Sequence, residues 1–362
     1  MFVKHNFLMK QIIKSLSNNK YSIRKLRSFI IIYVIFCSFS LYAGHPYDSL
    51  YIGQYKQKYN IKTDFFIKAI SLSFSTNKID SSSLTHIVTY LPNIKACYGI
   101  SMSGKGWGAG FAFKLPTIGK YGKVMGKTKY TDFKFSYLLR EIGFDTYYRN
   151  YQGFFLSQPK LLDPTWNGGA YPQRSDLHYT SMGLGGCYIF NEKKFSMKAF
   201  LSHTEKQKKS AGSFLMYVDA QLSRVKADSS IIPPGEELKY KSMRGLKGYS
   251  SASLSLLGGY AYSFVFLRNF YISPMLNIGT GYQLRNMDVD EGDVNRNNVF
   301  LTSNFKLAYG YRGKIIYVGV LFEWDSNEMV ADAISLNAST YLASFYIGFR
   351  FGKNKYIKKA DF

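Results

Sequence analysis

The sequence predicts an all-β protein: a transmembrane antiparallel β-barrel of about twelve strands, preceded by a signal peptide. First, residues 314–325 and 341–351 alternate strictly between apolar and wetter positions, the pattern of a strand with one face in an apolar phase. Second, aromatic residues make up 17% of the chain, with 31 Tyr and 29 Phe. Beyond the first 43 residues, no apolar run approaches a helical span. Many outward aromatics without long apolar runs are typical of outer-membrane barrels, in which every second residue meets lipid.

The first 43 residues have the composition of a secretory signal peptide. Seven basic residues and no acidic residue precede the apolar segment that starts at Phe29, and the small residue Ala43 closes it. The uninterrupted apolar core is short for a stable membrane anchor. We therefore expect export to the outer membrane of a Gram-negative cell, although the start codon and the cleavage site stay open. The expected divisions are a signal peptide at 1–43, a periplasmic segment at 44–60, the barrel at 61–352 and a C-terminal tail at 353–362.

The net charge is strongly basic, +24 for the whole chain, and +17 once the seven charges of the leader are removed. Such an excess first suggests nucleic acid. The Lys and Arg residues are, however, scattered or placed in connections such as 226–247, and they form no clustered basic face. We expect no nucleic-acid partner, and anionic lipid head groups as the counter-charge.

The same alternation predicts the remaining strands in chain order. Pro92 lies inside the second of them and, because proline removes a ladder donor, predicts a bulge there. Polar connections rich in Pro, Gly or charge are expected at 157–175, 226–247 and 287–297. The expected strands lie around 66–74 and at 84–103, 107–116, 128–141, 143–156, 176–190, 195–205, 214–225, 249–264, 270–283, 299–311, 314–325 and 341–351.

This set contains thirteen strands, whereas single-chain bacterial barrels have even numbers. Either residues 195–225 form one irregular spanning strand, which gives twelve, or an undetected strand makes fourteen. The even-number rule and the alternation of short turns with long loops favour twelve.

Several short motifs, in a fixed order along the chain, resemble a known family. They are found at 47–51 (YDSLY), 90–93 (YLPN), 111–116 (FAFKLP), 145–153 (DTYYRNYQG), 190–195 (FNEKKF) and 208–214 (KKSAGSF). Together they are similar to an uncharacterised family of Gram-negative outer-membrane β-barrel proteins that is classified as a domain of unknown function. The resemblance implies a place in the cell envelope and no particular activity.

One set of inward-facing positions carries mixed charges, which could line an aqueous pore and favour anions. Equally, the charges could pair with one another and fill a closed lumen. The sequence leaves both readings open. The candidate lumen-lining residues are Lys95, Asp132, Lys134, Arg140, Asp145, Arg149, Lys306, Glu323 and Arg350.

No catalytic, cofactor or metal site is expected. Cys97 and Cys187 fall mid-strand on inward faces several strands apart, so we expect free packed thiols rather than a disulfide. The histidines lack metal-ligand spacing. Ser202 and His203 are adjacent in a predicted strand and therefore point to opposite faces, so we expect an ordinary solvated histidine.

The expected function is that of a monomeric, non-enzymatic barrel in outer-membrane lipid, porin-like or solute-binding, which passes or binds small polar or anionic solutes through a basic lumen. A second reading is a closed structural or adhesion barrel that acts through 157–175 and 226–247. A third is a membrane-embedded lipid-modifying enzyme.

Overall fold

The protein is described by a computed structural model, which divides the chain into two compact units, residues 1–45 and 46–362. The described residues belong to the second unit. They are 47–76, 87–94, 96–104, 106–115, 121–238, 240, 243–290, 292–331 and 334–353. The expected signal peptide and the tail from 354 onward lie outside the described residues.

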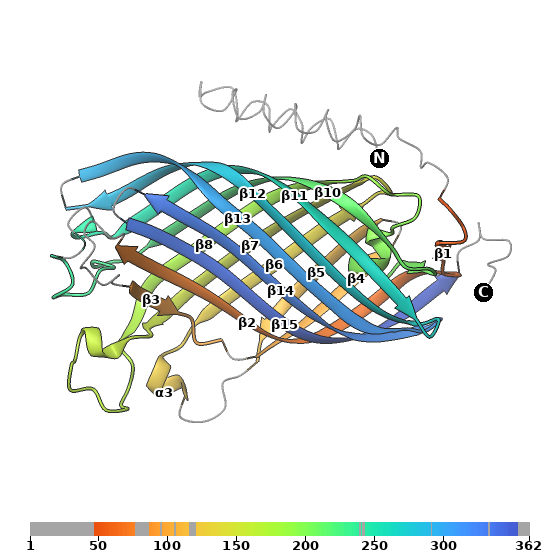
Figure 1. Cartoon of the computed structure of the whole chain (residues 1–362). Helices are drawn as coiled ribbons and strands as arrows, with labels where there is room; N and C mark the ends of the chain where they lie inside the picture. The colour runs from red at the N-terminus through yellow and green to blue at the C-terminus, as the bar shows by residue number, and fades with distance from the viewer. Residues whose placement is uncertain are drawn as a thin grey trace, which may run out of the picture. The chain divides into compact units, whose positions relative to one another are not determined.

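Twelve antiparallel strands close into a barrel (Figure 1). The ring is closed by pairing of the first long strand with the last, with Tyr59 opposite Phe351 and Thr76 opposite Ile334. Around the ring the strands are β2 (Gln57–Thr76), β4 (Cys97–Gly104), β5 (Trp107–Lys114), β6 (Lys129–Leu138), β7 (Ile142–Leu156), β8 (Gln173–Ile189), β10 (Ala211–Lys226), β11 (Gly248–Phe266), β12 (Phe270–Val289), β13 (Gly292–Arg312), β14 (Ile316–Ala331) and β15 (Ile334–Lys353). None of the helices in the described ranges is long and apolar enough to cross a membrane.

The predicted bulge at Pro92 is a complete break in the strand. The segment expected as one strand at 84–103 forms a short strand β3 (Ile87–Leu91) and then β4, and the two pair with different parts of β2. Beyond the ends of β5 and β6, β3 also pairs with β7, through Tyr90 and Leu91. A proline cannot donate to the ladder, so the wall is interrupted where the chain passes it.

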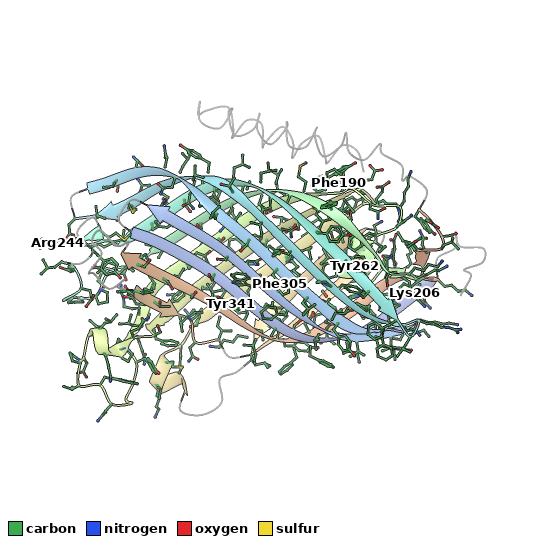
Figure 2. The ribbon with its side chains drawn as sticks, in the orientation of Figure 1. Phe190, Lys206, Arg244, Tyr262, Phe305 and Tyr341 are labelled. Atoms are coloured by element: carbon green, nitrogen blue, oxygen red, sulfur yellow. The ribbon has the colours of Figure 1, made fainter. Side chains whose placement is uncertain are left out.

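The outward face of the barrel is apolar, as predicted. On β15, Tyr341, Phe345 and Phe349 are each 46–53% exposed, while Tyr346 and Arg350 on the opposite face are buried. Side chains project in this way along the whole wall, among them Tyr262, Phe305 and Tyr341 (Figure 2). Exposing such an apolar belt to water would be unfavourable, so this face is suited to contact with lipid.

The barrel has two different ends. The terminal end is where β2 begins and β15 finishes, and the loop end is opposite. At the terminal end, most connections are tight turns, such as 139–141 and 267–269, but residues 190–210 fold into the lumen. These contain the π-helical turn η2 (Lys198–Ser202) and β9 (Glu205–Gln207), which pairs with β1 (Ile52–Gln54). At the loop end, the short helices α3 (Tyr121–Met125) and η1 (Pro159–Leu161) lie in the connections before β6 and β8.

The strand number of twelve is confirmed, but two expected elements are wrong. Residues 195–205 are not the first part of an irregular strand, because β10 alone spans the wall and the preceding residues turn inward. The expected acidic loop at 287–297 is instead strand, since β12 continues to Val289 and β13 begins at Gly292. Polar residues are tolerated there because they extend the hairpin beyond the apolar belt.

Candidate functional site

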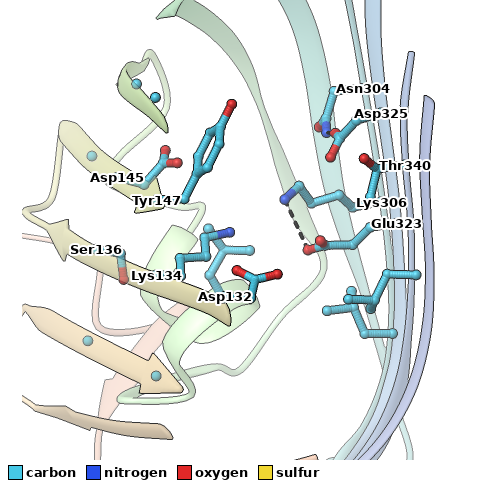
Figure 3. A pocket seen from close by; sticks show the side chains of 18 of the residues that line it. Asp132, Lys134, Ser136, Asp145, Tyr147, Asn304, Lys306, Glu323, Asp325 and Thr340 are labelled. Atoms are coloured by element: carbon cyan, nitrogen blue, oxygen red, sulfur yellow. Dashed lines mark hydrogen bonds and ion pairs between the residues drawn. The ribbon is translucent and has the colours of Figure 1, made fainter. Parts of the chain in front are cut away.

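A cavity of 420 Å³ lies inside the barrel between its two ends. It is lined by side chains from β2 around the ring to β15 and by the tip of the inward-folded segment at the terminal end. Figure 3 shows Asp132, Lys134, Asp145 and Tyr147 on one side of this chamber, facing Lys306 and its neighbours on the other.

Glycines on the inward faces of β4, β5 and β8 create the space. A Cβ on Gly183 would lie 2.5 Å from the Tyr147 ring, and one on Gly185 would lie 2.6 Å from the Asp219 carboxylate. Larger residues at these places would push polar side chains out of position. The alternation of glycine with Trp107 and Phe111, visible in the sequence, therefore separates a lipid face from a chamber face.

Ion pairs hold most of the chamber charges. Lys306 Nζ lies 3.0 Å from Glu323 Oε1 across β13 and β14 (Figure 3). Lys68 bonds to Asp132, which also has Arg149 Nε at 3.9 Å. Such pairs, desolvated by the barrel wall, are costly to break when one partner is removed.

Two carboxylates, on the strands that flank β8, lie on either side of a glycine. Gly185 is the register partner of both Asp145 on β7 and Asp219 on β10. Neither carboxylate forms an ion pair among the described residues. Lys134 on β6 is the register partner of Tyr147 on β7. It likewise forms no ion pair in the described part of the chain.

The chamber is mixed in charge and not basic. Its lining includes five cationic side chains and six carboxylates. The positive excess of the sequence therefore does not lie in this chamber. The cations are Lys62, Lys68, Lys134, Arg149 and Lys306, and the carboxylates are Asp64, Asp132, Asp145, Asp219, Glu323 and Asp325.

Six of the nine predicted lumen residues line the chamber: Asp132, Lys134, Asp145, Arg149, Lys306 and Glu323. Two others point inward but lie nearer the terminal end. Arg140 donates to Glu205 at 2.7 Å, and Arg350 donates to the His203 carbonyl at 3.0 Å. Lys95 lies outside the described residues.

Sequence reasoning missed several chamber residues. Lys68 shares a face with Phe66 and Ile70, and this face points inward on β2 rather than to lipid. A lysine in an otherwise apolar row was the available signal. Asp219 and Asp325 also line the chamber and were not predicted from the sequence.

At the loop end, the connection between β10 and β11 folds into the barrel mouth. We call its described residues, 227–238, 240 and 243–247, the loop plug. Ile231, Ile232 and Leu246 are fully buried, in one apolar cluster with residues of β2, β3, β7, β8 and β12. The Tyr240 hydroxyl donates to the Phe74 carbonyl at 3.0 Å, and burial, followed by Glu236, raises the pKa of this tyrosine.

At the terminal end, residues 190–210 fill the lumen, and we call them the terminal plug. Phe195, Met197 and Phe200 are buried against β6, β8 and β10–β13. The plug also carries charge: Glu205 accepts from Arg140 and from the Ser196 hydroxyl at 2.6 Å. Burial lowers the pKa of Lys198, although Glu205 opposes the effect.

Cys97 and Cys187 are free and buried. They belong to different apolar clusters, Cys97 to the one at the loop plug and Cys187 to the one at the terminal plug. No group of three or more His, Cys, Asp or Glu side chains among the described residues could hold a metal ion.

The family model that matches residues 46–351 is "Domain of unknown function (DUF4421)". The chain belongs to the DUF4421 family. The match covers the barrel from the segment before β1 to the end of β15, and it confirms the resemblance of the short motifs. No curated protein matches the chain.

Solved structures with a similar fold are outer-membrane proteins of different kinds. The outer membrane protease OmpT from Escherichia coli is 8% identical, with a TM-score of 0.40, and the match covers 82% of this chain and 97% of that one. The β domain of the Bordetella autotransporter BrkA is 11% identical, with a TM-score of 0.36, over 81% and 100%. The P. putida toluene transporter TodX is 10% identical, with a TM-score of 0.28, over 82% and 91%.

Proposed function

We propose that this DUF4421 barrel is a gated outer-membrane channel for small polar solutes, closed at rest by its two plugs. The observation that supports it is the 420 Å³ chamber, which is lined with charged and polar groups yet lies between two inward-folded segments. A barrel whose only task was structural could fill its centre with side chains. Here, glycines keep the centre open.

The chamber favours solutes that carry both charges, or none, over simple anions. Lys134 on β6 and the pair Asp145 and Asp219 on β7 and β10 offer unpaired groups of opposite sign on one wall. A rigid array of hydrogen-bonding groups selects small polar molecules in this way. This replaces the anion preference expected from the net charge.

The adhesion reading is weakened at one of its two loops. In the connection between β10 and β11, apolar side chains such as Ile231 and Leu246 are buried in the mouth, whereas Leu238 is 79% exposed. The connection at 157–172 does project beyond the wall, beside α3 (Figure 1), and Leu162 in it is 43% exposed. It can therefore contact other molecules while the barrel acts as a channel.

Planar-bilayer conductance tests the proposal. We expect no steady current from the wild-type chain or from variants in which only 193–209 or only 229–245 is replaced by a short Gly-Ser linker. The variant with both replacements should conduct steadily. A steady wild-type current would contradict closure at rest, and a silent double variant with an intact strand spectrum would contradict a continuous lumen.

Charge substitution in the double variant sharpens the test. Lys134→Glu removes the unpaired chamber cation and should shift the reversal potential toward cation selectivity. Arg149→Glu should do the same. Lys129→Glu is the matched control, because Lys129 lies on the same strand as Lys134 but does not line the chamber, and it should leave the reversal potential unchanged.

A further inference from the structure

The tip of the terminal plug is fastened to the barrel wall by hydrogen bonds to two of its carbonyl groups. The Ser202 carbonyl accepts from Asn60 Nδ2 and from the Ser103 hydroxyl, each at 3.0 Å. The His203 carbonyl accepts from Arg350 Nε at 3.0 Å. The donors belong to β2, β4 and β15, so three strands hold one short stretch of the plug.

The His203 side chain sits in a cage of tyrosine rings. Its ring centroid is 4.5 Å from that of Tyr317, 5.1 Å from that of Tyr346 and 6.5 Å from that of Tyr271. The residue is 3% exposed and adopts a left-handed backbone conformation with φ of 55°. Histidine is one of the few non-glycine residues that are enriched there.

The charged groups that act on this histidine are cationic. Lys62 approaches from β2, Arg312 from β13 and Arg350 from β15, while β12 and β14 contribute tyrosines. Arg312 lies 3.3 Å over the Tyr271 ring, and its guanidinium nitrogens have no hydrogen-bond partner among the described residues.

The carboxylates nearby are engaged elsewhere. Asp64 on β2 bonds to Lys62 at 2.9 Å, and Glu205 on the plug itself is held by Arg140. His203 Nδ1 is buried and has no hydrogen-bond partner in the described part of the chain. Burial, followed by Arg312, Lys62 and Arg350, lowers the pKa of His203 well below its ordinary value.

We propose that His203 is a proton-sensitive latch, and that its protonation releases the terminal plug and opens the chamber to the periplasm. The inference rests on the proposed channel function and adds its trigger. A charged imidazole in this cage would face three cations and no available carboxylate. Outside the cage, water would solvate the same charge, so the proton favours the undocked plug.

The direction of the pH dependence follows from how tightly His203 binds its proton when the plug is docked and when it is undocked. The docked histidine holds its proton less tightly than the undocked one, whose pKa is about 6.5. The docked state is therefore fully favoured above about pH 6.5. Below it, the undocked population rises by roughly tenfold per pH unit until the docked histidine also takes a proton.

Cys187 reports the opening, because it lines the chamber and is packed in the same apolar cluster as Phe195 and Phe200. The full chain carrying Cys37→Ser and Cys97→Ala is reacted in detergent with 4,4′-dithiodipyridine, a water-soluble reagent that modifies thiols also in acid. Each rate is divided by that of free cysteine at the same pH. We expect the normalised rate to rise roughly tenfold per pH unit below about pH 6.5.

Three variants separate this latch from other acid effects. His203→Asn keeps a residue suited to the left-handed conformation but cannot titrate, and its rate should stay low at pH 5. His203→Lys should react fast at every pH. His178→Asn removes a histidine on β8 outside the chamber lining and should behave as wild type.

A wild-type rate that does not change with pH would overturn the latch, as would an acid response that survives in His203→Asn. Either result leaves the channel proposal standing if the chain without both plugs conducts. Conversely, a silent double-plug variant would remove the channel function while the labelling result on plug release still holds.

Discussion

The two plugs close one lumen by different physical means. The loop plug has a large apolar contact: Ile231, Ile232 and Leu246 have no exposed surface, and they pack against residues from much of the ring. Hydrogen bonds from Tyr90 and Arg174 to its carbonyl groups add to this contact. The terminal plug has an apolar base at Phe195 and Phe200, but its tip is fixed by hydrogen bonds and charges. Apolar burial depends little on pH, whereas a buried titratable group makes stability depend on it directly.

This difference indicates which end of the barrel can serve as a gate. A segment fixed by many dispersed apolar contacts opens only when something competes for those contacts, such as an amphiphile. A segment whose tip depends on one neutral histidine among cations opens in response to a single proton. Because Cys97 lies in the loop-plug cluster and Cys187 in the terminal-plug cluster, the chain carries one native thiol reporter for each plug.

The largest effect is expected from Ile231→Asp in the loop plug. Ile231 is 0% exposed, so the substitution removes buried apolar surface and places a carboxylate inside an apolar cluster. A cost of about 4 kcal/mol or more follows, and Cys97 in the Cys187→Ala background should react on the order of 1000-fold faster.

Leu238→Asp is the matched control, because Leu238 in the same plug is 79% exposed, and it should leave the Cys97 rate unchanged. If Ile231→Asp accelerated Cys187 as strongly as Cys97, the two plugs would not be independent, and the comparison between them would fail.

A smaller effect is expected from Glu205→Ala in the terminal plug. Glu205 accepts from both Arg140 and Ser196, and its side chain is 6% exposed. Removing it leaves the Arg140 guanidinium buried without its partner, at a cost of about 3 kcal/mol. The Cys187 rate at pH 7.5 should rise on the order of 100-fold.

Glu192→Ala, in the turn that begins the same plug, should change the Cys187 rate little. An unchanged rate in Glu205→Ala would show that the apolar base alone holds the plug, and that the polar contacts at its tip add nothing.

The sequence predicts the wall of this molecule far better than its plugs. The alternation at Tyr341–Phe349 predicts which side chains face lipid, because successive side chains of a strand point to opposite faces. The sequences of the plugs have no sustained alternation of apolar and polar residues. Residues 195–205 were expected as strand because Phe195, Met197 and Ala199 alternate with polar residues, yet the same apolar residues pack inside the lumen. The chamber charges were found where they alternate with lipid-facing aromatics, as at Asp132 and Lys134.

The smallest effect is expected from Ser103→Ala, which removes one donor to the Ser202 carbonyl and leaves Asn60 and Arg350 in place. One neutral hydrogen bond is worth about 1 kcal/mol, so the Cys187 rate at pH 7.5 should rise about fivefold. Ser101→Ala, two residues earlier on the same face of β4, should leave it unchanged. Because the acid response belongs to His203 and not to this bond, the slope of the Ser103→Ala rate against pH should equal that of the wild type. A flattened slope would mean that the tip opens in steps, with the Ser202 carbonyl released before the histidine leaves its cage.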